Sequence, residues 1–170
     1  ITKYAASKFD GQVPAAGEPG DAEAWMTAEL AERLPRLIEH YEAMEFRKAA
    51  AETRAIWAAG NEYLTKAEPW VKYKNDVDAA AVGVRAGLNL AALFGILALP
   101  IIPDAGKKIL DALAIPEEHR NLPGAKPDTD FAKLLDALPH GMPITPPDVL
   151  FQKIEDEQVA AWTEQFGGGN

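Results

Sequence analysis

Apolar and small residues recur at helical spacing through residues 44–66 and predict an amphipathic helix there. A helix turns once in about 3.6 residues, so residues at that spacing share one face. The predicted face comprises Phe46, Ala49, Thr53, Ile56, Trp57, Gly60, Tyr63 and Leu64. We expect this face to pack in the core, with Trp57 among its buried members.

A second segment, residues 78–99, is almost wholly apolar from Leu88 onward. A helix that crosses a membrane needs about 20 predominantly apolar residues. The apolar run here is shorter, follows Arg85, contains Asn89 and stops at Pro100. We therefore predict that this segment is a central core helix and not a membrane span.

Shorter patterned segments complete the prediction of helices. They are residues 1–9, 21–41, 104–114 and 155–166. Within the second of them, Pro35 predicts a kink or a restart, because proline removes a backbone hydrogen bond and clashes with the preceding turn. Residues 115–148 are rich in proline and indicate loops. No strand-rich region is evident, so the predicted fold class is an all-α helical bundle.

The composition suits one soluble domain with a core of its own. The chain has 170 residues, of which 48% are hydrophobic and 25% charged. Its formal net charge of -9 argues against a broad nucleic-acid-binding surface. The charge is uneven, because residues 47–76 hold six basic and four acidic residues, a balance of +2, which leaves -11 for the rest. A small, local RNA contact fits this distribution.

The residue types that carry most enzyme chemistry are sparse. The chain has no cysteine and three scattered histidines, so neither a disulfide framework nor a zinc site is expected. The one serine, Ser7, has no histidine nearby in sequence, which argues against a serine nucleophile. We expect no catalytic residue and no metal ligand. The chain starts at Ile1 without a signal-peptide pattern, and we expect it to be a piece of a longer protein.

The stretch from Asn61 to Asn75 joins the end of one predicted helix to the start of the next. Pro69 disfavours a helical conformation at Glu68, so the chain should break there. The large aromatic Trp70 follows at once. A tryptophan at such a position can pack on the core or face outward as a stacking platform, and the residues alone leave both alternatives open.

Four phrases occur in an order that resembles the anticodon-binding domain of bacterial methionyl-tRNA synthetases, which are class I enzymes. They are KFDG at 8–11, GNEY at 60–63, EPW at 68–70 and LFQKIE at 150–155. The resemblance covers nearly the full chain. It implies an anticodon-binding helical bundle over residues 1–154, with its first helix truncated at the start, and a C-terminal helix with a glycine tail over residues 155–170.

The resemblance also implies site residues. In the family, the tryptophan of the Pro-Trp pair stacks on bases of the CAU anticodon, and it corresponds here to Trp70, beside Pro69. Candidate contacts to the tRNA backbone are Lys72, Lys74 and Lys3, for which an ordinary solvated surface is the alternative. The family's Asn and Arg that read the cytosine edge would precede Ile1.

The function implied is recognition of the CAU anticodon of tRNA(Met), as part of a methionine–tRNA ligase that attaches methionine to tRNA using ATP. The catalytic signatures of the family are not in this chain. No cofactor is therefore expected here, and ATP, Mg²⁺ and zinc would belong to the rest of a cytoplasmic enzyme. The implied partners are the tRNA anticodon loop and the catalytic portion of the same enzyme, with no membrane.

The C-terminal helix has two possible packing partners. It carries Val159, Trp162 and Phe166. The resemblance implies that these residues dock on the catalytic portion, and the alternative is that they pack on this domain's own core.

Two other functions stay open. The first is an anticodon-binding domain of another class I synthetase, although the spacing from Asn61 to Trp70 favours methionine. The second is a non-enzymatic helical module that binds a protein. Such a module would show an exposed apolar patch away from Trp70.

Overall fold

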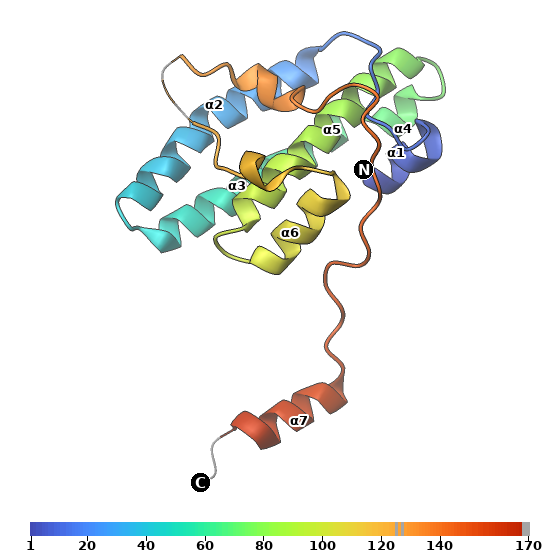
Figure 1. The fold of residues 1–170 in the computed structure, drawn as a ribbon. Helices are drawn as coiled ribbons and strands as arrows, with labels where there is room; N and C mark the ends of the chain where they lie inside the picture. Colours follow the sequence, from blue (N-terminus) through green and yellow to red (C-terminus); the bar gives the residue numbers. More distant parts are fainter. Residues whose placement is uncertain (125, 127, 168–170) are drawn as a thin grey trace.

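The computed structural model describes residues 1–124, 126 and 128–167, and these form a bundle of helices (Figure 1). The α-helices are α1 (Thr2–Lys8), α2 (Asp21–Glu42), α3 (Phe46–Ala67), α4 (Pro69–Lys72), α5 (Val77–Ala98), α6 (Pro103–Ala112) and α7 (Asp156–Phe166). Two 3-10 turns follow α6 and are η1 (Glu117–His119) and η2 (Phe131–Leu135). Among the described residues, β-pairing is limited to an isolated bridge between Gln12 and Pro143. The predicted all-α fold class is confirmed.

Helices α2 and α3 form a hairpin whose facing sides build one half of the core. The short link between them passes through Met44, which has a left-handed backbone with φ 57°. Apolar residues at helical spacing on both helices are buried between them. They include Leu30, Leu34, Leu37, Ala49, Ile56 and Tyr63. The prediction that one face of each of these two helices packs in the core is therefore confirmed.

Three expectations for this hairpin need correction. The predicted restart at Pro35 is wrong, because α2 runs on to Glu42 with the flanking Leu34 and Leu37 buried, which holds the helix in place. The alternative, a kink at Pro35, stays a prediction. Phe46 was expected in the core but is 64% exposed, since it is the first residue of α3 and lies next to the link that joins the two helices. Trp57 is half-buried at the edge of the core.

Helix α5 runs through the middle of the bundle (Figure 1). The Asp76 carboxylate caps its start by accepting a hydrogen bond from the Ala79 N–H at 2.9 Å. Within the described residues, α5 is the one helix long and apolar enough to cross a membrane, yet 83% of its apolar window is buried inside the fold. The prediction that it is a core helix is confirmed.

Two buried polar side chains of α5 fasten the loops that cover it. Arg85 donates to carbonyl groups of the loop before α2 at 2.9 and 3.2 Å, and its Nε pairs with Asp136 at 2.8 Å. The Oδ1 of Asn89 accepts hydrogen bonds from two backbone N–H groups that follow η2, each at 2.8 Å. Buried polar groups need such partners, so both residues fix irregular backbone against the central helix.

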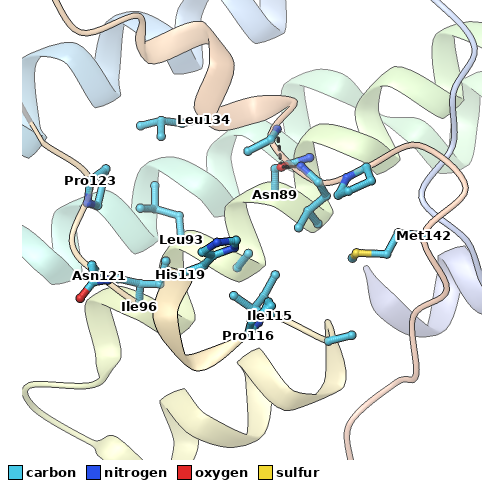
Figure 2. A pocket seen from close by; sticks show the side chains of 15 residues that line it. Asn89, Leu93, Ile96, Ile115, Pro116, His119, Asn121, Pro123, Leu134 and Met142 are labelled. Atoms are coloured by element: carbon cyan, nitrogen blue, oxygen red, sulfur yellow. Dashed lines mark hydrogen bonds between the residues drawn. The ribbon is translucent and has the colours of Figure 1, made fainter.

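A cavity of about 480 Å³ lies between α5 and the loop-rich segment that follows α6 (Figure 2). Its walls are mainly apolar and include Leu93, Ile96, Ile115 and Met142. Asn89 reaches it, but the side chain of Asn89 is occupied by hydrogen bonds to the backbone. The cavity is therefore mainly apolar, with two further polar side chains, His119 and Asn121, in its wall.

Helix α7 lies apart from the bundle, at the end of an extended segment (Figure 1). Residues 151–167 are all exposed. The side chains of Val159, Trp162 and Phe166 are 50%, 47% and 72% exposed. The alternative that these residues pack on this domain's own core is therefore wrong for the described chain. Of the expected glycine tail, residues 168–170 lie outside the described residues.

Candidate functional site

The predicted Pro-Trp break forms a sharp turn between two helices. Helix α3 ends at Ala67, Glu68 adopts a left-handed backbone with φ 45° and ψ 49°, and α4 begins at Pro69. A left-handed conformation is uncommon for residues other than glycine and carries some strain. Proline suits the first position of a helix, because it has no N–H to leave unpaired and its φ is already helical.

Pro69 is buried and seats α4 on the central helix. A Cβ atom placed on Gly83 of α5 would lie 3.2 Å from the Cβ of Pro69 and 3.5 Å from the Cβ of Ala67. The absence of a side chain at Gly83 thus lets the turn approach α5 closely. Pro69 anchors the start of α4 against the core.

Trp70, the next residue, faces outward. Its side chain is 45% exposed, and the neighbouring Val71 is 46% exposed. The sequence left a core position and an outward position open, and the structure has the outward one. A half-exposed indole on an anchored turn has a free aromatic surface on which a nucleic-acid base can stack.

The three candidate lysines lie on elements that adjoin in the fold. Lys72 is part of α4 and is half-buried, whereas Lys74 follows α4 and is exposed. Lys3 is exposed on α1, which contacts the end of α4 through the rings of Tyr4 and Tyr73, with centroids 6.2 Å apart. The structure thus places α1 and α4, which are far apart in the sequence, next to each other (Figure 1).

Sequence reasoning missed the aromatic residues that join α1 to α4. Tyr73 contacts both Tyr4 and Phe9. The available signal was the position of Tyr73, three residues after Trp70 in a short helical turn. That signal names no partner, because the partners lie more than sixty residues earlier.

Carboxylates with shifted pKa values lie in ion pairs away from α4. Hydrogen bonds from Lys48 and then His40 lower the pKa of Glu45, and a hydrogen bond from Arg120 lowers the pKa of Asp111. Such shifts stabilise the charged carboxylate and do not create an acid or base that titrates near neutral pH. Across the described part of the chain, no group of three or more His, Cys, Asp or Glu residues could hold a metal ion.

An outward tryptophan on an anchored turn is a geometry suited to stacking on a nucleic-acid base. Residues 13–170 match the sequence profile of the anticodon binding domain of methionyl tRNA ligase. The chain belongs to this family. The family relationship separates the two synthetase alternatives left by the sequence and assigns the domain to the methionine enzymes.

Relatives of the methionyl-tRNA ligase domain match nearly the whole chain. The methionine–tRNA ligase of Hyphomonas neptunium is 79% identical over 170 residues, which cover 99% of this chain and 29% of that protein. The methionine–tRNA ligase of Caulobacter vibrioides is 49% identical over 168 residues, with the same two shares of 99% and 29%. The chain thus spans less than a third of the length of these relatives.

Solved structures of methionyl-tRNA synthetases share the fold. The Mycobacterium tuberculosis enzyme in complex with methionyl-adenylate aligns with a TM-score of 0.74 and 25% identity, over 89% of this chain and 29% of that chain. Its apo form aligns with a TM-score of 0.73. The helical architecture described above is thus that of methionyl-tRNA synthetases.

Proposed function

We propose that this domain selects the CAU anticodon of tRNA(Met) within a methionine–tRNA ligase, which joins methionine to tRNA using ATP. The observation that carries the proposal is the outward indole of Trp70 on a turn whose preceding residue, Pro69, is buried. A rigid platform loses little conformational freedom when a base stacks on it, so more of the stacking energy remains for binding.

The charge distribution supports a small contact around this platform. Positive charge for contacts to the phosphates of the tRNA backbone would come from Lys72, Lys74 and Lys3, which lie on α4, just after it, and on the adjoining α1. The domain as a whole has a net charge of -9 and would repel RNA elsewhere. Affinity would therefore come from a few stacked bases and local phosphates.

The rest of the enzyme would supply the chemistry. ATP and Mg²⁺, together with zinc where the enzyme carries it, would act in the catalytic portion, in the cytoplasm. The exposed Val159, Trp162 and Phe166 of α7 would dock on that portion, because a helix with an unpartnered apolar face is stabilised when another surface covers it.

The experiment that tests the proposal compares Trp70→Ala with the wild type in the complete enzyme. Loss of stacking worth about 1–3 kcal/mol per base should raise the KM for tRNA by about 5- to 150-fold. Methionine activation without tRNA should stay unchanged, because the reacting groups are elsewhere. A matched control is Phe46→Ala, which removes another exposed aromatic side chain, at the far end of α3 from α4.

Either of two results would contradict the proposal. The first is an unchanged KM for tRNA in Trp70→Ala. The second is an equal loss of both activities, which would indicate misfolding or a role in catalysis and not in recognition.

A further inference from the structure

Helix α4 is too short to hold its own position. It has four residues, and a single helical turn is not stable without contacts to other elements. Pro69 fixes its first residue against Gly83 of α5. The orientation of Trp70 also depends on what fixes the other end of the turn.

Tyr73, the residue that caps the end of α4, packs on α1 and on the residue that follows it. Its ring meets the ring of Phe9 edge-on, with centroids 5.5 Å apart at 77°, and the ring of Tyr4 with centroids 6.2 Å apart at 82°. The ammonium of Lys8 lies 5.5 Å from the centre of the same ring. The Tyr73 hydroxyl donates to the Lys8 carbonyl at 3.4 Å. These contacts come from a segment more than sixty residues earlier in the chain.

Trp70 lies between these two attachments. The Tyr73 N–H donates to the Pro69 carbonyl at 2.9 Å, so the whole turn is one hydrogen-bonded unit. Movement at Tyr73 is therefore transmitted through the backbone to Trp70. Edge-to-face rings have a preferred geometry, so they fix the angle of the turn and not only its distance from α1.

We propose that Tyr73 is the positioning residue of the stacking platform, which holds the Trp70 indole in one orientation by locking α4 onto the end of α1. This inference rests on the proposed function for its effect on tRNA, but its structural part does not. A residue that contributed only to stability would act on the whole fold and not on Trp70 in particular.

The structural part can be tested by ¹⁹F NMR of the complete protein labelled with 5-fluorotryptophan, with the Trp70 resonance assigned by Trp70→Phe. In Tyr73→Ala, the Trp70 resonance should shift and broaden, while the resonances of Trp25 and Trp57 stay in place as controls for the fold. Tyr73→Phe should leave the Trp70 resonance nearly unchanged, because it keeps the ring and loses only a long hydrogen bond.

A second variant tests the same contact from the other side. Phe9→Leu removes a ring that packs on Tyr73 without changing α4, and it should perturb the Trp70 resonance selectively as well. Phe9→Leu also tests the positioning role of Tyr73 if the Tyr73→Ala protein fails to fold. An unchanged Trp70 resonance in a folded Tyr73→Ala or Phe9→Leu protein would overturn the proposal.

The kinetic readout separates this inference from the proposed function. Tyr73→Ala should raise the KM for tRNA at least about fivefold, with unchanged methionine activation, and Tyr73→Phe should restore the wild-type KM. Tyr73→Ala could perturb the Trp70 resonance while neither Tyr73→Ala nor Trp70→Ala changes the KM for tRNA. That result would support the positioning role and overturn the proposed function. A raised KM for tRNA in Trp70→Ala, together with an unchanged Trp70 resonance in Tyr73→Ala, would support the proposed function and overturn the positioning role.

Discussion

At the residue scale, Tyr63 and Glu23 form a buried hydrogen bond between the two helices of the hairpin. The Tyr63 hydroxyl donates to the Glu23 carboxylate at 2.5 Å, and the two side chains are 0% and 8% exposed. Burial and the neighbouring carboxylate raise the pKa of Tyr63 well above its ordinary value, against a smaller opposing effect of Arg85. Tyr63 therefore stays protonated in the folded domain where a free tyrosine would ionise.

This shift predicts a loss of stability at alkaline pH. In the unfolded chain Tyr63 releases its proton above about pH 10, whereas the folded chain retains it, so the unfolded state is favoured as the pH rises. The contribution is fully present below that pH. Between pH 8 and pH 10.5 the free energy of unfolding of the 170-residue chain should fall by about 0.8 kcal/mol more than that of Tyr63→Phe.

Urea unfolding of both proteins at the two pH values measures this difference. Tyr4, whose pKa is also raised by burial and by Tyr73, is present in both proteins, so its contribution cancels. Parallel loss of stability in the wild type and Tyr63→Phe would show that Tyr63 is free to ionise in the folded state.

Single residues also show the limit of sequence reasoning. Helical spacing identified Tyr63 as a core residue, but not its partner Glu23, which lies 40 positions away. The outward position of Trp70 could not be predicted either. It depends on the contact of Pro69 with Gly83, a tertiary contact that no local pattern encodes.

At the element scale, the extents of the helices were largely predictable because their apolar patterns are strong. Helices α3, α5 and α6 occupy the predicted segments, with Asp76 capping α5 and Pro103 starting α6. The errors concern tertiary context. Burial of the residues around Pro35 keeps α2 continuous, and no element of the described chain covers the apolar face of α7.

Helices α5 and α6 approach each other closely where both carry glycine. A Cβ atom on Gly106 would lie 2.8 Å from the Gly95 carbonyl oxygen and 3.1 Å from the Leu99 backbone nitrogen. Contacts this short with backbone cannot be relieved by a change of rotamer. The two glycines therefore set the distance between these helices.

Gly106→Ala should destabilise the domain despite the better helix propensity of alanine. The clash costs about 1–3 kcal/mol, and the gain in propensity offsets about 1 kcal/mol of it. We expect a net loss of up to about 2 kcal/mol in the free energy of unfolding, measured by urea unfolding. The matched control is Gly124→Ala, where a Cβ meets nothing within 4 Å and stability should stay within about 0.5 kcal/mol. A more stable Gly106→Ala variant would show that the helices can separate freely.

At the scale of the whole molecule, the domain combines a bundle with its own core and a helix that lies outside it. Trp162 on α7 is 47% exposed and faces no partner among the described residues. If α7 docks on the catalytic portion, the environment of Trp162 should differ between this chain and the complete enzyme.

Acrylamide quenching of fluorescence can compare the two states, with Trp162 as the sole tryptophan in each protein. Trp162 should be quenched readily in the 170-residue chain and several-fold less in the complete enzyme, because docking covers the indole. The same comparison for Trp70 should show equal quenching in both proteins, provided that tRNA is absent. Equal quenching of Trp162 in the two proteins would contradict docking.

Recognition of the anticodon by Trp70 is the central claim, and one titration tests it most directly. The complete enzyme, with Trp70 as its only tryptophan, is titrated with a tRNA(Met) anticodon stem-loop while the fluorescence is recorded. Stacking of a base on the indole should quench the signal with a saturable dependence, and a stem-loop with a changed CAU should not produce it at the same concentration. An intact fold with no response to the CAU stem-loop, or with equal quenching by both stem-loops, would contradict the claim.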